Sequence, residues 1–219
     1  MWKSVVIASL LLTAALDMSC AASEAKVVAL ASPGLAEGSA VDGCRPALTG
    51  KGGPVAWQVT RPATATSGAA ITETSREQVD TRYPICIVDS ITATDVDIGV
   101  DFTPLGGQLD QAAGLIFRVQ DPDNYYVVRA NALENNVRLY RTVNGERRQF
   151  AGADVTVSSG KMQHLQIRVE GDRITVTFEG KQLYKAYDRT FPARGTIGLW
   201  TKADSSTVFT TLTVTILKE

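Results

Sequence analysis

Hydrophobic and polar residues alternate with a period of two along much of the chain, and residues 94–102 give the clearest case. Successive side chains of a β-strand point to opposite faces of its sheet, so this pattern predicts a strand with one buried face. No stretch repeats its apolar residues with the 3.6-residue period of a helix over three turns. The pattern therefore predicts an all-β protein. The apolar positions of this strand are Val96, Ile98, Val100 and Phe102.

The chain contains about a dozen short segments of this kind, separated by turns that contain Gly, Pro, Asn or Asp. One of these turns, Asn144-Gly145, has the sequence of a type I′ hairpin turn. We therefore predict a two-sheet antiparallel β-sandwich of the jelly-roll type. The predicted strands cover residues 55–60, 69–72, 83–88, 94–102, 114–119, 125–131, 136–142, 162–170, 173–179, 182–187, 195–202 and 207–217.

The length and charge of the chain suit one globular domain. It has 219 residues, of which 44% are hydrophobic and 21% charged, enough to bury a sizeable core. The formal net charge is −1 and the sequence has no long basic run. A surface that tracks nucleic-acid phosphates is therefore not expected.

Residues 1–22 have the pattern of a secretory signal peptide. Lys3 supplies a positive charge, and the apolar run over residues 5–16 is too short to span a bilayer comfortably. Small residues follow and offer cleavage after Ala21 or Ala22. We expect an exported protein, periplasmic or secreted, without a transmembrane span.

A lipid anchor on Cys20 is an alternative, in which this cysteine becomes the first residue of an envelope protein. Asp17 disfavours it, because the lipoprotein signal usually has an aliphatic residue at that position. Residues 23–50 are rich in Ala, Gly, Ser and Pro without periodicity, which predicts a linker or leader. The jelly-roll domain is then expected over residues 51–219.

If Cys20 leaves with the signal peptide, the cysteines that remain are Cys44 and Cys86. Export places them in a compartment that permits disulfides, so we predict that they are bonded to each other. The alternative is two buried free thiols.

The sequence gives little support to catalytic or metal chemistry. Sandwich glucanases carry Glu, Asp and Glu at alternate positions of one strand, and the nearest string here, residues 170–172, falls on a predicted turn. His164 is the only histidine, which disfavours a zinc site or a Ser-His-Asp triad. Residues 121–124 offer oxygen ligands for calcium but fit a turn better. We predict no metal site and no cofactor, and leave catalytic residues unassigned.

The strands predicted over residues 114–119, 125–131 and 136–142 sort their side chains onto two faces. The face opposite the core gathers arginines, tyrosines and an amide. These groups can satisfy the hydroxyls of a sugar and cover its apolar C–H face. The residues expected to face the core are Leu115, Phe117, Val119, Tyr126, Val128, Ala130, Val137 and Leu139.

The same alternation over residues 195–202 turns Trp200 and Lys202 away from the core. An exposed tryptophan is costly, which favours a binding groove. The alternative is a solvated sheet surface, which is common for antiparallel sheets. The candidate ligand-binding residues are Arg118, Tyr125, Arg129, Asn131, Arg138, Tyr140, Trp200 and Lys202.

At these residues the chain resembles a known superfamily. The strings DQAAGLIFRVQDPDNYYVVRANALENNVRLYRTVNGERR, HLQIRVEGDRITVTFEGKQL and FPARGTIGLWTKADS look like concanavalin A-like lectins and glucanases, and the resemblance covers residues 57–214. More specifically, the chain is similar to secreted bacterial domains labelled 3-keto-disaccharide hydrolase-like or related to family 16 glycoside hydrolases. The resemblance implies a jelly roll whose concave sheet faces a glycan. Members that act on 3-keto-glycosides are metal-dependent hydrolases or lyases.

The leading hypothesis is an exported, non-catalytic β-sandwich that binds a carbohydrate or a similar polyhydroxylated ligand on its concave sheet. The alternative, which rests on the resemblance, is a glycoside hydrolase or lyase acting on 3-keto-glycosides. A structural envelope protein with a vestigial groove is a third possibility.

Overall fold

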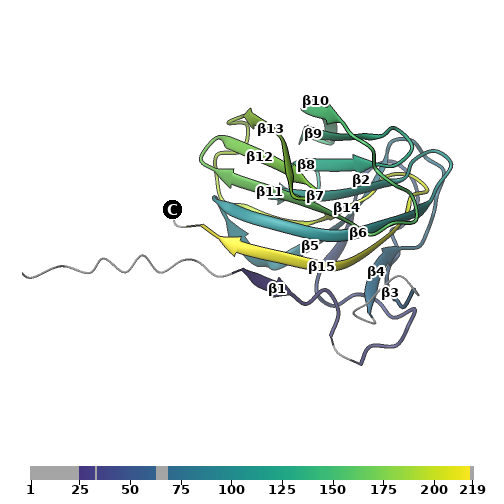
Figure 1. Cartoon of the computed structure of the whole chain (residues 1–219). Coiled ribbons are helices and arrows are strands. Elements are labelled where there is room, and N and C mark those ends of the chain that lie inside the picture. The colour runs from purple at the N-terminus through teal and green to yellow at the C-terminus, as the bar shows by residue number, and fades with distance from the viewer. Residues whose placement is uncertain (1–24, 33, 63–68, 218–219) are drawn as a thin grey trace, which may run out of the picture.

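All regular elements in the described part of the chain are β-strands (Figure 1). The computed structural model describes residues 25–32, 34–62 and 69–217. The strands are β1 (Lys26–Val28), β2 (Arg45–Gly50), β3 (Trp57–Thr60), β4 (Ala70–Glu73), β5 (Arg82–Ala93), β6 (Val96–Gly106), β7 (Ala112–Asp121), β8 (Asn124–Asn131), β9 (Asn136–Val143), β10 (Glu146–Asp154), β11 (Gln163–Glu170), β12 (Arg173–Phe178), β13 (Lys181–Tyr187), β14 (Gly195–Trp200) and β15 (Ser206–Ile216).

The strands form two sheets that face each other as a sandwich (Figure 1). The eight-stranded sheet has the order β13-β12-β11-β6-β15-β4-β3, with β1 also paired to β15. The seven-stranded sheet has the order β10-β9-β8-β7-β14-β5-β2. All pairings between these strands are antiparallel. The predicted all-β, two-sheet antiparallel β-sandwich is confirmed.

The main hydrophobic core contains side chains from both sheets. The alternation predicted for residues 94–102 is confirmed, because the apolar side chains at the alternating positions 96, 98, 100 and 102 are each at most 1% exposed. Tyr126 and Val128 of β8 and Leu199 of β14 enter the same cluster from the other sheet. Burying a side chain of this size contributes roughly 1.5–3 kcal/mol, so this layer supplies most of the stabilisation.

Two strands lie within the stretch that we assigned to a linker or leader. β1 pairs with β15 and β2 pairs with β5, so the described part of residues 26–50 belongs to the sandwich. β1 is only three residues long, and β2 is an edge strand that begins with exposed Arg45 and Pro46. Neither strand has the alternation of a half-buried strand, which is why the pattern did not indicate them.

The turn predicted at Asn144-Gly145 joins β9 to β10. Asn144 has φ 51° and Gly145 has φ 79°, the positive values that a type I′ turn requires. The turn brings β10, which the pattern did not single out, into register with β9. β10 forms one edge of the seven-stranded sheet, so its side chains alternate less regularly between buried and exposed positions.

A disulfide joins Cys44, just before β2, to Cys86 in β5, which confirms the predicted bond. It fastens the edge strand to its neighbour. The predicted signal peptide, residues 1–22, and the alternative anchor at Cys20 lie outside the described residues. Within the described ranges, no helix has the length and apolar character that crossing a bilayer requires.

Gly198 should not tolerate a side chain. It lies in β14 between β5 and β7, where an added Cβ would lie 2.2 Å from the backbone oxygen of Cys86. We expect Gly198→Ala to lower the free energy of unfolding by about 1–3 kcal/mol, because the ladder must shift to make room. Gly106→Ala is the matched control, since a Cβ there meets nothing within 4 Å. Equal effects of the two variants in urea unfolding would contradict this account.

The disulfide should contribute a large share of the stability. It joins residues 42 apart in sequence, so its removal in Cys44→Ala with Cys86→Ala should lower the free energy of unfolding by about 4 kcal/mol in the chain-entropy model. Urea unfolding measures the difference. Two thiols that react with a labelling reagent after non-reducing denaturation of the wild-type protein would show that the bond is not formed.

Candidate ligand-binding site on the concave sheet

The face of the seven-stranded sheet that points away from the main core carries an apolar layer of its own. In β8, Tyr126 and Val128 face the main core, while Tyr125 and Val127 point into a second cluster. Each residue of the second cluster is at most 8% exposed, so this sheet is covered on both sides. The cluster consists of Ile85, Ile87, Ala112, Ile116, Val119, Tyr125, Val127, Tyr140 and Trp200.

This face is concave, because side chains from distant strands meet above it. β10 and β5 are five positions apart in the sheet, which would separate them by about 24 Å in a flat sheet. Nevertheless, the Arg147 guanidinium of β10 lies 4.7 Å from the centre of the Tyr83 ring of β5. The seven-stranded sheet must therefore curve toward this side, which we call the concave face.

A second contact closes the concave face from the other edge. Thr49 of β2 lies 2.9 Å from the hydroxyl oxygen of Tyr125 in β8 and donates a 2.6 Å hydrogen bond to the carbonyl of Pro122. Burial raises the pKa of Tyr125. Tyr125 is thus an interior group that ties two distant strands together.

Aromatic rings and one arginine fill the centre of the concave face. The Tyr83 and Trp200 rings stack with their centres 5.6 Å apart. The Arg147 guanidinium lies 4.3 Å from the centre of the Tyr140 ring and 5.3 Å from that of Trp200. Such cation–π contacts contribute about 0.5–2 kcal/mol each, depending on desolvation. We call Tyr83, Tyr140, Arg147 and Trp200 the aromatic cluster.

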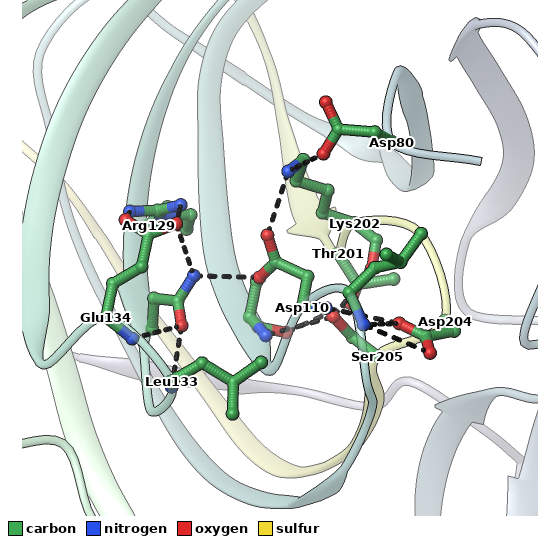
Figure 2. Close-up of polar contacts among 12 residues, drawn as sticks. Asp80, Asp110, Arg129, Leu133, Glu134, Thr201, Lys202, Asp204 and Ser205 are labelled. Atoms are coloured by element: carbon green, nitrogen blue, oxygen red, sulfur yellow. Dashed lines mark hydrogen bonds and ion pairs between the residues drawn. The ribbon is translucent and has the colours of Figure 1, made fainter. Parts of the chain in front are cut away.

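A network of polar side chains begins at Arg129, near the end of β8 and 5.7 Å from the centre of the Tyr140 ring. Figure 2 shows the contacts within this network. Arg129 donates to both carboxylate oxygens of Glu134, at 3.1 and 2.8 Å, and to Asn136 Oδ1 at 2.7 Å. Asn131 Nδ2 donates to Asp110 at 2.9 Å and to Glu134 at 3.1 Å. The Asn131 side-chain oxygen accepts from the backbone N–H groups of Leu133 and Glu134, which fixes the turn after β8.

Lys202 completes the network, as Figure 2 shows. Its Nζ lies 2.5 Å from Asp80 and 3.0 Å from Asp110. Burial alone would lower the pKa of Lys202, but the two carboxylates outweigh it and raise this pKa. Asp110 is fully buried, and burial raises its pKa although Lys202 opposes the change. We call Asp80, Asp110, Arg129, Asn131, Glu134 and Lys202 the polar cluster.

The loop before β7 is held so that Asp110 faces the network. The Asp204 carboxylate accepts hydrogen bonds from the backbone N–H groups of Gln108, Leu109 and Asp110, at 2.7, 3.0 and 3.2 Å. Burial would raise the pKa of Asp204, but these backbone donors outweigh burial and lower it. The carboxylate therefore stays charged and anchors the loop.

Seven of the eight predicted ligand-binding residues lie on or beside the concave face. The exposed fractions of their side chains differ. Tyr125 and Trp200 have no exposed surface and Tyr140 is 8% exposed, whereas the Arg138 side chain is 23% exposed. The Glu134 and Asp80 side chains are 48% and 73% exposed. The residues on or beside this face are Tyr125, Arg129, Asn131, Arg138, Tyr140, Trp200 and Lys202.

A glycine makes room for Arg138. Gly152 of β10 lies opposite Arg138 of β9, and a Cβ at Gly152 would come within 2.5 Å of the Arg138 Cδ. The arginine can therefore lie across the edge strand, where it pairs with the exposed carboxylate of Asp154 at 2.5 Å. Its guanidinium stays partly accessible at the rim of the concave face.

Arg118 does not lie on the concave face, so its predicted place there is wrong. The β7–β8 register shifts between Phe117 and Asp121, and Arg118 adopts a positive φ of 47°. This bulge reverses the alternation, so Val119, expected in the main core, enters the second cluster. Arg118 instead donates to the backbone oxygens of Thr94, Phe191 and Gly171 at one end of the sandwich.

The sequence reasoning missed Tyr83, Arg147, Asp110 and Glu134. Tyr83 alternates with Ile85 and Ile87 on one face of β5, which was a usable signal. Arg147 follows the hairpin turn on β10, and its three ring partners come from other strands. Asp110 and Glu134 lie in connections between strands, where alternation gives no information.

The remaining candidate groups lie away from this face. His164 lies 2.7 Å from Asp101 in the eight-stranded sheet. Glu170 ends β11 and pairs with Arg168 and Arg173, which hold its pKa at about 2. Asp121 accepts from the backbone N–H of Asp123, as a turn residue does. Within residues 25–32, 34–62 and 69–217, no group of three or more His, Cys, Asp or Glu side chains is arranged to hold a metal ion.

Several solved structures are similar to this fold. The carbohydrate-binding module CBM66 from Bacillus subtilis has a TM-score of 0.60 and 22% identity, covering 80% of this chain and 97% of that one. A Bacillus subtilis protein of unknown function with a galectin-like fold has a TM-score of 0.55 and 12% identity, covering 78% and 88%. Domain 4 of AbnA, a GH43 extracellular arabinanase from Geobacillus stearothermophilus solved with arabinotriose, has a TM-score of 0.51 and 13% identity, covering 78% and 82%.

At these identities the similarity establishes a shared fold. No protein-family model and no curated protein sequence matches the chain.

Glu134 should make the stability of the protein depend on pH. The hydrogen bond from Arg129 is the main reason that the pKa of Glu134 falls from 4.5 to about 2. A lowered pKa means that the charged carboxylate stabilises the fold above about pH 4.5, and that this contribution is lost as the pH falls toward 2.

The test is thermal unfolding of Glu134→Gln between pH 7 and pH 2.5. Because Glu134 is about half exposed, solvent screening limits its contribution, and we expect the Tm to fall by about 2–4 °C at pH 7. The difference from the wild-type protein should shrink below pH 4.5. Glu146→Gln, at an exposed position of β10, is the control. A Tm difference that is constant over this pH range would contradict the lowered pKa.

Proposed function

We propose that the chain is an exported protein that binds a carbohydrate on the concave face of its seven-stranded sheet. One observation carries this proposal. The concave face holds aromatic rings directly beside guanidinium, amide and carboxylate groups whose positions are fixed by hydrogen bonds.

Sugar recognition needs these two kinds of group together. Aromatic rings cover the apolar C–H face of a sugar, and planar charged groups hydrogen-bond its hydroxyls. Arg129 is already held by Glu134 and Asn136, so little conformational freedom remains to be lost when a ligand binds. The rim groups within reach of a ligand include Arg138, Glu134 and Asp80.

The similar structures support this use of the fold. CBM66 is described as a carbohydrate-binding module, and the AbnA domain was solved in complex with arabinotriose. Fold similarity alone does not transfer a function, so the proposal rests on the residues of the concave face. The disulfide between Cys44 and Cys86 supports export, because such bonds form in oxidising compartments.

Of the two functions considered, we propose glycan binding without catalysis. The alternative, cleavage of a 3-keto-glycoside, has one observation in its favour: Asn131 bonds to two carboxyl groups whose pKa values move apart. Burial raises the pKa of Asp110, and Arg129 lowers that of Glu134 to about 2. Such a difference is typical of an acid and base pair. Asp110 has no exposed surface, which favours a structural role for it.

Calorimetric titration with a panel of oligosaccharides, including 3-keto-disaccharides, tests the proposal. Arg138→Ala should weaken glycan binding about tenfold, the typical effect of losing one hydrogen bond to a charged group. The matched control is Arg168→Ala, an arginine of β11 in the eight-stranded sheet that also pairs with carboxylates. It should leave the affinity unchanged within about twofold.

The absence of binding to every glycan, or equal effects of the two variants, would count against the concave-face site. Release of product from a 3-keto-disaccharide during the same titration would favour the hydrolase or lyase instead.

A further inference from the structure

Arg147 is partly buried, and it differs from the buried arginines of the described residues in its lack of a carboxylate partner. Arg82 pairs with Glu73, Arg118 with Asp95, and Arg129 with Glu134. The contacts of Arg147 are the rings of Tyr83, Tyr140 and Trp200. Its Nη1 is buried without a hydrogen-bond partner.

Ring contacts do not satisfy a guanidinium. A ring attracts the positive charge of the guanidinium, but it does not replace the oxygen acceptors that the five N–H donors need. A buried donor left without an acceptor costs about 1–3 kcal/mol, and more when it is charged. The Nη1 group of Arg147 therefore lacks a hydrogen-bond acceptor.

A second unmet donor belongs to another arginine that contacts the Tyr140 ring. The Arg129 guanidinium lies 5.7 Å from the centre of the same Tyr140 ring, and its Nε is also buried without a partner. Two arginines with unmet N–H groups thus flank one tyrosine. Arg138 pairs with Arg129 in the β8–β9 register and adds a third positive charge, opposed by the highly exposed Asp154. Exposed ion pairs of this kind contribute little.

We propose that Arg147 recognises an anionic group, a carboxylate or a sulfate, on an acidic glycan bound at the concave face. This inference rests on the proposed function and names the class of glycan. A planar guanidinium held by rings presents parallel N–H groups that match two oxygens of one anion, a geometry that a neutral hydroxyl does not provide. Of the three rings that contact Arg147, that of Tyr83 is partly exposed, and the sugar to which the anion is attached would stack there.

A ligand can approach the exposed part of the Arg147 side chain from solvent. Arg147 extends from β10, an edge strand, and is only partly buried. Binding there leaves the main core untouched, because the aromatic cluster lies on the opposite side of the sheet.

Matched acidic and neutral oligosaccharides test the inference on the full-length protein. The pairs are trigalacturonate with α-1,4-galactotriose, and a chondroitin tetrasaccharide with and without sulfate. The wild-type protein should bind the acidic member of at least one pair more tightly, and its affinity should fall as NaCl is raised. The pair that shows the difference identifies the anion as carboxylate or sulfate.

Arg147→Gln should weaken binding of the acidic member about tenfold to a hundredfold, the range for hydrogen bonds to charged groups, and weaken binding of the neutral member by a much smaller factor. Arg148→Gln is the matched control, because Arg148 is the next residue of β10 and its side chain is exposed. Arg147→Lys keeps the charge but not the planar fork, so it should lose part of the affinity even if Arg147→Gln folds poorly.

Equal affinity of the wild-type protein for the acidic and neutral members would overturn the inference and leave the proposed function standing. Equal losses in Arg147→Gln and Arg148→Gln would also overturn it. The absence of binding to any glycan would instead remove the proposed function itself.

Discussion

The curvature of the seven-stranded sheet is the constraint on which the rest of the structure depends. One face of this sheet packs against the eight-stranded sheet, and the other curls until its edges are bridged by Arg147 on one side and Thr49 on the other. A flat sheet would leave Trp200 and Tyr125 in water, at a cost of about 25 cal/mol for each Å² of apolar surface. Curling buries these rings without a third layer, and it brings charged groups from different strands to one rim.

The buried charges of Arg82, Arg129 and Lys202 are tolerated because each has a carboxylate partner. Arg82 is fully buried and donates to Glu73, at 3.3 and 3.4 Å, and to the carbonyl of Pro54 at 3.0 Å. This pair lies at the start of β5 and the end of β4, and so limits the path of the connection that carries Asp80 toward Lys202. Removing one member of such a pair would leave an uncompensated charge in the interior. The backbone path of these strands therefore determines where the side chains of the polar cluster lie.

The alternation of side chains predicted the sandwich and most strands, because one buried face per strand leaves a clear period-two signal. It also separated Tyr125 and Trp200 from the main core correctly. It failed where a bulge interrupts the alternation, as at Arg118, whose positive φ accompanies the shift of Val119 to the other face. It also could not indicate that Arg147 meets Tyr83, because sheet curvature arises from the packing of all seven strands and no short segment encodes it.

The edge strands also bear on how copies of the molecule behave toward one another. β2 and β10 end the seven-stranded sheet, and β13 ends the eight-stranded one. β2 carries Pro46, which has no N–H to offer, while β13 carries Lys181 and Lys185 at exposed positions. A strand that pairs with β2 would find no N–H donor at Pro46, and a strand that approaches β13 would meet the positive charges of its two exposed lysines. These residues disfavour, at the β2 and β13 edges, the intermolecular strand pairing that leads to fibrils.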